Sequence, residues 1–168
     1  MFSNKLIKLF VLMLICLSLE NKALAVDPEV LAKKALCHTC LAKIYVAQGQ
    51  DPEAIKEYQE LLKLIPNDAA THFDFGNVLA RNNKPDLATA QFKFAAKLKP
   101  TIPEYQVGLG NGLMYVKDFE GAVQAYTKAC MLGGKYQKQL QTAQQYQAQQ
   151  KLLDQYKEKV KKQQENTE

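Results

Sequence analysis

Two cysteines enclose a histidine in the segment Cys37-His38-Thr39-Cys40. A C-x-x-C pair is the spacing of thiol redox centres, and two thiolates this close are also soft ligands for a metal ion. The segment therefore suggests two chemistries, thiol–disulfide exchange and metal handling, and the element that carries the pair decides how well each of them fits.

A helix that starts at Asp27-Pro28-Glu29 would carry the pair, because Asp is a preferred N-cap residue and Pro and Glu suit a first turn. Cys37 then lies two to three turns inside, beyond the reach of the helix dipole that activates redox cysteines. No strand precedes it, and a disulfide between positions i and i+3 in mid-helix would be strained. We favour the simpler interpretation, in which the thiols are small buried residues and the histidines, His38 and His72, pack between helices.

Metal, haem and enzyme sites find little further support. Cys37, Cys40 and His72 offer three ligands, whereas a structural zinc ion takes four. Haem attachment requires C-x-x-C-H, but Leu41 follows Cys40. Cys130 has no evident partner, and the sequence has no G-x-S-x-G, H-E-x-x-H or P-loop spacing. We expect no enzymatic activity, no metal and no cofactor.

A pattern with a period of 34 residues organises the chain from residue 35 to residue 134. Each pass has a large–small pair, an apolar residue, a turn, and then Ala, an aromatic residue and a small or apolar residue at helical spacing. The three passes are Leu41-Ala42, Tyr45, Gly49, Ala54, Tyr58, Leu61, Pro66; Phe75-Gly76, Leu79, Asn83, Ala88, Phe92, Ala95, Pro100; and Leu109-Gly110, Leu113, Lys117, Ala122, Tyr126, Ala129, Gly134.

This pattern resembles the tetratricopeptide repeat (TPR), a helix-turn-helix unit of the same period. The resemblance implies an all-α solenoid of three units, 35–68, 69–102 and 103–134, with residues 26–34 extending the first helix. The small residue of each pair lets two helices approach, and the aromatic residue fills the space beside it. Asp51-Pro52-Glu53, Pro85 and Pro103 suit helix starts, with Asp51 as an N-cap, while Pro66 and Pro100 end helices.

The two ends of the chain differ from the repeats. Residues 1–25 have a basic start, an apolar stretch and Ala23-Leu24-Ala25, which predicts a cleaved secretory signal peptide and export to the periplasm or an equivalent space. We expect no stable membrane span after cleavage, because the apolar stretch is too short to cross a bilayer. Residues 135–168 are rich in Gln and Lys and predict an amphipathic helix that covers the last unit, with a tail beyond about Gln150.

Without the predicted signal peptide, the net charge of the chain is small. Residues 26–168 contain 19 Lys and Arg against 16 Asp and Glu. These charges are scattered, the chain has no Trp and a single Arg, and no basic stripe with interleaved aromatic residues is present. We therefore expect no nucleic-acid partner. Self-association through the groove or the terminal helix is left open.

In a TPR stack the first helices of the units line a concave groove. Projecting the family pattern onto this chain gives the predicted contacts Lys43, Phe73, Asn77, Arg81, Val107, Asn111, Met114 and Tyr115. Asn77 and Asn111 share one repeat position, where two amides in register can hold the backbone of an extended peptide. The alternative is that Asn at this position only reflects the family pattern.

Several groove positions argue against one well-known kind of partner. The carboxylate-clamp type of TPR domain, which grips chaperone C-termini, has Lys and Asn where this chain has Thr39 and Lys43, and Asn where it has Asp74. We instead expect an apolar anchor near Phe73, Met114 and Tyr115. The resemblance implies a non-catalytic protein-interaction scaffold of the cell envelope that binds a peptide segment of a partner, and the thiol or metal function of Cys37 and Cys40 is the alternative.

Overall fold

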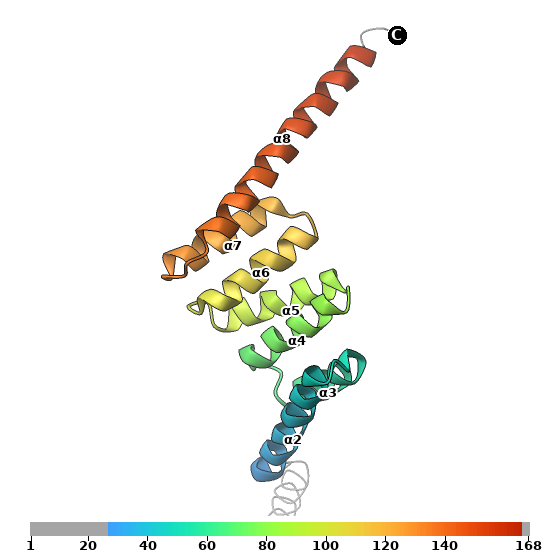
Figure 1. Cartoon of the computed structure of the whole chain (residues 1–168), viewed down its shortest axis with the longest axis vertical. Helices are drawn as coiled ribbons and strands as arrows, with labels where there is room; N and C mark the ends of the chain where they lie inside the picture. The colour runs from blue at the N-terminus through green and yellow to red at the C-terminus, as the bar shows by residue number, and fades with distance from the viewer. Residues whose placement is uncertain (1–26, 166–168) are drawn as a thin grey trace, which may run out of the picture.

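The computed structural model describes residues 27–165. Over this range the chain forms helices and turns without a strand, which confirms the predicted all-α solenoid (Figure 1). The helices are α2 (Pro28–Ala47), α3 (Asp51–Leu64), α4 (Ala69–Arg81), α5 (Pro85–Leu98), α6 (Pro103–Tyr115), α7 (Phe119–Met131) and α8 (Gln137–Glu165). The predicted signal peptide, 1–25, lies outside the described residues.

Successive helices pair within units, α2 with α3, α4 with α5 and α6 with α7, and the pairs stack along the long axis of the molecule (Figure 1). The turn inside each pair repeats with the same period. Gly49, Asn83 and Lys117 are spaced by one repeat, and all three have positive φ, at 72°, 54° and 63°. The backbone N–H of the next residue then donates to a carbonyl in the last turn of the first helix, from Gln50 to Tyr45, Lys84 to Leu79 and Asp118 to Leu113. This pattern closes the C-terminus of each first helix.

The small and aromatic positions of the pattern meet as predicted. A Cβ added to Gly76 would lie 2.7 Å from the Phe92 ring, and one added to Gly110 would lie 2.7 Å from the Tyr126 ring. In the first unit Ala42 is completely buried and Tyr58 nearly so. The close approach of the paired helices therefore depends on the absence or small size of one side chain in each unit.

The helix starts agree with the sequence only in part. Asp27 caps α2, where its side chain accepts a hydrogen bond from the Glu29 N–H at 3.0 Å. The predicted cap at Asp51 is wrong, because Gln50 is the N-cap residue of α3 and makes no capping hydrogen bond through its side chain. Asp51 begins the helix one residue later, and its carboxylate instead meets Arg81.

α8 covers α7 and then continues past it (Figure 1). Its residue Ala143 is fully buried, and the Tyr146 ring stacks on Phe119 with a centroid distance of 5.5 Å. Beyond this contact the helix projects from the body, with Leu152, Leu153 and Tyr156 exposed. No helix within residues 27–165 is both long and apolar enough to span a membrane.

Candidate functional site

Two adjoining depressions lie along the first helices of the units, α2, α4 and α6. The charged depression, of about 290 Å³, is lined by Lys43, Val46, Ala47, Tyr58, Asp74, Asn77, Val78 and Arg81. The aromatic depression, of about 320 Å³, is lined by Asn77, Ala80, Arg81, Asn83, Pro85, Ala88, Phe92, Asn111, Gly112 and Tyr115. Asn77 and Arg81 line both, so the two depressions form one groove with α4 at its centre.

The charged depression holds both signs of charge. An Nη2–H group of Arg81 donates to Asp51 Oδ1 at 2.5 Å, which ties the guanidinium to the start of α3. Asp74, half-buried in the same depression, has a raised pKa because burial disfavours its charged form, while the nearby Lys43 charge lowers this pKa and Asp68 raises it. Lys43 is exposed at the edge.

Tyr58 forms part of the wall of the charged depression and is buried. Burial, together with the Asp74 carboxylate, raises the pKa of its phenol to about 12, and the Arg81 charge opposes the shift. Tyr58 therefore remains a neutral hydroxyl at physiological pH, so the ionic groups of this depression are Lys43, Asp74 and Arg81.

The aromatic depression combines amides with an apolar floor. The floor comes from α5, through Pro85, Ala88 and Phe92, and the exposed Tyr115 lies at the edge. The Tyr126 hydroxyl donates to Asn111 Oδ1 at 2.6 Å, which fixes the orientation of that amide. Phe92, the residue equivalent to Tyr126 one unit earlier, has no hydroxyl, so Asn77 lacks the corresponding tether.

Five of the eight predicted contact residues line this groove: Lys43, Asn77, Arg81, Asn111 and Tyr115. The other three are packed among neighbouring side chains. Phe73 lies between Phe92 and Tyr105, at centroid distances of 5.7 and 5.0 Å. Val107 and Met114 pack against the cluster formed by α7 and α8, and Met114 also lines a separate depression beside α8. Of the three residues predicted to hold an apolar anchor, Tyr115 therefore lines the groove, whereas Phe73 and Met114 pack against other side chains.

Sequence reasoning did not identify Tyr58 as a groove residue or Asp51 as the partner of Arg81, and it noted Asp74 only as a departure from the clamp pattern. The position of Asp74, three residues before Asn77 on one helix, is a signal that was available, because such residues share a face. The Asp51–Arg81 pair had no such signal, since the two residues are 30 positions apart and belong to different units.

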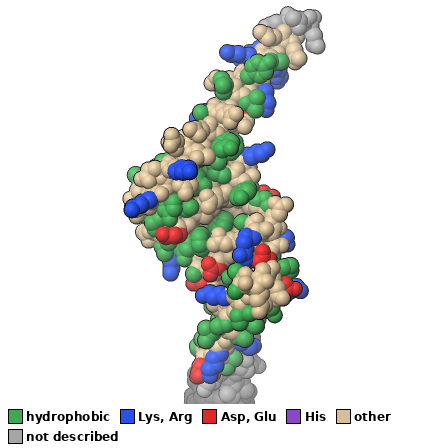
Figure 2. Space-filling view, in the orientation of Figure 1, with side chains coloured by type: hydrophobic (Ala, Val, Ile, Leu, Met, Phe, Trp, Pro, Cys, Tyr) green, Lys and Arg blue, Asp and Glu red, His purple; other side chains and the backbone are tan. Residues whose placement is uncertain are grey.

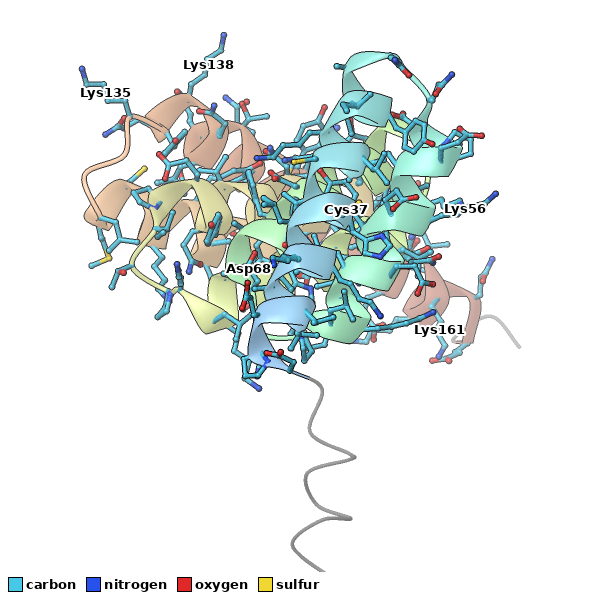
Figure 3. All side chains as sticks on the ribbon, turned by 90° about the horizontal axis from the view of Figure 1, so that it is seen from below. Cys37, Lys56, Asp68, Lys135, Lys138 and Lys161 are labelled. Atoms are coloured by element: carbon cyan, nitrogen blue, oxygen red, sulfur yellow. The ribbon has the colours of Figure 1, made fainter. Side chains whose placement is uncertain are left out.

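The cysteines and histidines lie away from the groove. The expectation of buried thiols is wrong for Cys37 and Cys40, which are free and exposed, and Cys130 is partly buried. Figure 3 looks from the α2 end, and Cys37 lies on this nearest helix. The solvent reaches these thiols because α2 is the first described helix and no helix of residues 27–165 covers its outer side.

Both histidines connect the helices of their own unit, as predicted. His38 Nδ1 is 2.7 Å from Glu57 Oε2, and His72 Nδ1 is 2.7 Å from Gln91 Oε1. His72 Nε2 also lies 2.9 Å from the Pro66 carbonyl oxygen. Within residues 27–165 no three His, Cys, Asp or Glu side chains are placed to share a metal ion.

Comparison with known proteins identifies the repeat. Residues 42–83 match the family model described as TPR repeat. A curated relative, the peroxisomal targeting signal receptor of Candida glabrata, is 27% identical over 108 residues, which is 64% of this chain but only 17% of the receptor. The chain therefore spans about a sixth of that relative.

Solved structures show the same fold. The first TPR of Spaghetti (RPAP3), bound to the HSP90 peptide SRMEEVD, aligns with a TM-score of 0.66 and 20% identity, covering 74% of this chain and 98% of that one. The TPR2B-domain complex of yeast Sti1 with pHsp70 aligns with a TM-score of 0.61 and 21% identity, covering 70% and 98%. Residues 42–83 therefore match a TPR repeat, and the chain shares the fold of solved TPR domains.

Proposed function

We propose that the protein is a non-catalytic interaction module that binds an extended peptide segment of a partner protein along α2, α4 and α6. The observation that carries this proposal is the continuous groove in which Asn77 and Arg81 belong to both depressions. The fold supports it by analogy, because the Spaghetti domain that shares the fold is bound to a peptide. Because this chain is only 20% identical to that domain, the analogy extends to the fold alone. The kind of partner is therefore argued from the residues that line the groove.

The two halves of the groove suit different parts of a peptide. Amides donate and accept hydrogen bonds, so Asn77 and Asn111 are suited to hold the peptide backbone. An apolar or aromatic side chain fits the aromatic depression over Phe92 and beside Tyr115. In the charged depression the Asp74 carboxylate lies among the basic groups and Asp51 occupies Arg81, which disfavours a strongly acidic peptide terminus.

We further propose that the protein acts in the cell envelope, after export through the predicted signal peptide. The support is the sequence of residues 1–25. The test is to isolate the protein from the extracytoplasmic fraction and determine its N-terminal residue. Cleavage after Ala25 gives Val26 as the first residue, whereas an intact Met1 in the cytoplasmic fraction would contradict export.

The groove is tested with peptides selected from a display library by the purified protein. Titration calorimetry then compares the wild type with an Asn77→Ala/Asn111→Ala variant. We expect the variant to bind at least about tenfold more weakly, a difference of about 1.4 kcal/mol. Asn67→Ala, an exposed Asn in the loop before α4, is the matched control and should bind like the wild type. Unchanged affinity in the double variant would place recognition outside the groove.

The thiol or metal function is a second candidate, favoured by one observation. Cys37 and Cys40 are both exposed and free on the same helix, which is the accessibility that such chemistry needs. Native mass spectrometry of the protein with Cu(I) tests it, because two neighbouring thiolates are suited to a soft metal ion. One bound ion that is lost in Cys37→Ser and Cys40→Ser, but kept in Cys130→Ser, would support this candidate, and no bound ion would contradict it.

A further inference from the structure

Building on the proposed function, we infer that the groove selects a basic peptide segment, in which a lysine or arginine side chain pairs with the carboxylate of Asp74. Asp74 lines the charged depression, and Asn77, one turn further along α4, lines both depressions. The basic residue of the partner therefore lies close in its sequence to the apolar or aromatic residue that fits over Phe92. Asp74 is in this sense a specificity-determining residue.

Asp74 differs from the other acidic side chains that the fold partly covers. Within residues 27–165 these side chains are four: Asp51, Glu57, Asp68 and Asp74. The first three have partners in the protein, namely a guanidinium group, an imidazole nitrogen and the first turn of α4. The carboxylate of Asp74 has neither a hydrogen bond nor an ion pair with another residue of the described range. Its oxygens can be reached from the charged depression, so a peptide group can supply the missing partner.

The position of Asp74 in its helix does not explain the residue. Asp is favourable at the N-cap and in the first turn of a helix, but it is one of the poorer residues in a helix interior. In α4 the N-cap is Asp68, whose side chain accepts a hydrogen bond from the Thr71 N–H at 2.8 Å. Asp74 lies in the middle of this helix, where burial disfavours its charged form and raises its pKa. A cation bound in the depression would offset this cost of burial.

The bases of the charged depression leave Asp74 available. Arg81 donates to Asp51 at 2.5 Å, so its charge already has a partner inside the protein. Lys43 opposes the effect of burial on the pKa of Asp74, but it is exposed and forms no ion pair with any described residue. On the face shown in Figure 2, acidic and basic side chains are mixed over the body of the molecule. The few residues of the groove, rather than a surface field of one sign, therefore decide which charge it accepts.

The environment of Tyr105 shows that negative charge predominates on the other side of Asp74. Tyr105 belongs to α6 and contacts Phe73, the residue before Asp74. Burial raises the pKa of its phenol, and three nearby carboxylates raise it further, those of Asp68, Asp74 and Glu104. An ammonium or guanidinium group that enters here is attracted by all three, whereas a peptide carboxylate is repelled.

The test uses peptides that the wild type selects from a display library, synthesised with acetylated and amidated ends so that only side chains carry charge. We expect these peptides to contain more Lys and Arg than Asp and Glu. Each basic residue is then replaced by norleucine, which keeps the aliphatic part of lysine without its charge. In titration calorimetry this replacement should weaken binding to the wild type by at least about fivefold and change binding to Asp74→Asn little. The double-mutant cycle isolates the contact between Asp74 and the basic side chain.

Two further variants separate this contact from a general effect of charge. Glu120→Gln is the matched control, because it removes the same charge from an exposed residue in the first turn of α7, and it should respond to norleucine as the wild type does. Lys43→Gln should bind the basic peptides more tightly than the wild type, because a competing cation near Asp74 is removed. Circular dichroism verifies that each variant keeps its helical content.

The outcomes distinguish the basic specificity from the groove itself. Selected peptides without basic residues, or an equal effect of norleucine on the wild type and on Asp74→Asn, would overturn the role of Asp74. Peptide binding that is still weakened in the Asn77→Ala/Asn111→Ala variant would then leave the proposed function standing. Unchanged affinity in that double variant would refute the groove, and the basic specificity with it.

Discussion

Arg81, the last residue of α4, donates a hydrogen bond from its guanidinium to the carboxylate of Asp51, the first residue of α3, at 2.5 Å. The pair joins the first and second units next to the groove. The Arg81 side chain is half-exposed, while that of Asp51 is largely covered. The strongest cation of the groove is therefore already neutralised before any partner binds.

Asp51→Asn should release Arg81 for a peptide carboxylate. We expect the variant to bind acidic peptides more tightly than the wild type does, with little change for neutral peptides. The loss in stability should be about 0.2–1 kcal/mol, as is usual for an exposed ion pair. Peptide titration and chemical denaturation measure the two effects. The Arg81→Ala/Asp51→Asn double variant is the control, and it should show no gain for acidic peptides.

Gly76→Ala should destabilise the protein. In an ordinary helix interior this change is favourable by about 1 kcal/mol. Here the new methyl group would lie 2.7 Å from the buried Phe92 ring, and overpacking of this kind costs about 1–3 kcal/mol. Urea denaturation gives the sign directly. A variant that is more stable than the wild type would mean that the Phe92 ring can move aside.

The same contact predicts a coupling between the two positions. Phe92→Leu alone should destabilise the protein by leaving a void, but it should cost less in the Gly76→Ala background, where the smaller side chain makes room for the methyl group. Additive effects of the two substitutions would show that the residues do not contact each other in solution.

The fold could be predicted because the residues that determine helix packing recur in each repeat. The small residue at Gly76 or Gly110 and the aromatic residue 16 positions later recur with the period, and the structure places each pair in contact. The helix start at Asp51 was predicted incorrectly, because Asp is also a frequent N-cap residue and the local sequence cannot show that its carboxylate meets Arg81 instead.

The candidate site was less predictable than the fold. The repeat position of Asn77 and Asn111 predicted that they line the groove, and both line it in the structure. It could not show that Phe73 is held between Phe92 and Tyr105, because that depends on the side chains of two other helices. Exposure of Cys37 was likewise not predictable, because it depends on α2 having no earlier helix of the described chain against its outer side.

The exposed cysteines should react in the folded protein. We expect Cys37 and Cys40 to be modified by a maleimide reagent under native conditions well before the partly buried Cys130. Mass spectrometry of proteolytic fragments, sampled over time, assigns each modification to its residue. A denatured sample is the control, in which all three should react at similar rates. Protection of Cys37 and Cys40 until unfolding would indicate that another part of the protein or a second copy covers α2.

Asp74 should make the stability of the protein depend on pH in a particular direction. Burial raises the pKa of its carboxyl in the folded chain, so the folded state favours the protonated form more than the unfolded state does. Stability associated with this group is therefore lost as the pH rises through its unfolded and then its folded pKa. Asp74→Asn removes the ionisation, and we expect this variant to melt at a higher temperature than the wild type at neutral pH.

The advantage of Asp74→Asn should shrink as the pH falls and disappear only well below the unfolded pKa of Asp, about 3.9, where Asp is protonated in both states. Thermal denaturation followed by circular dichroism between neutral and acidic pH measures this. Asp86→Asn is the matched control, because the exposed Asp86 lies in the first turn of α5, where a negative charge is favourable. That variant should melt at a lower temperature than the wild type at neutral pH. A lower melting temperature for Asp74→Asn as well would mean that Lys43, rather than burial, dominates the environment of Asp74.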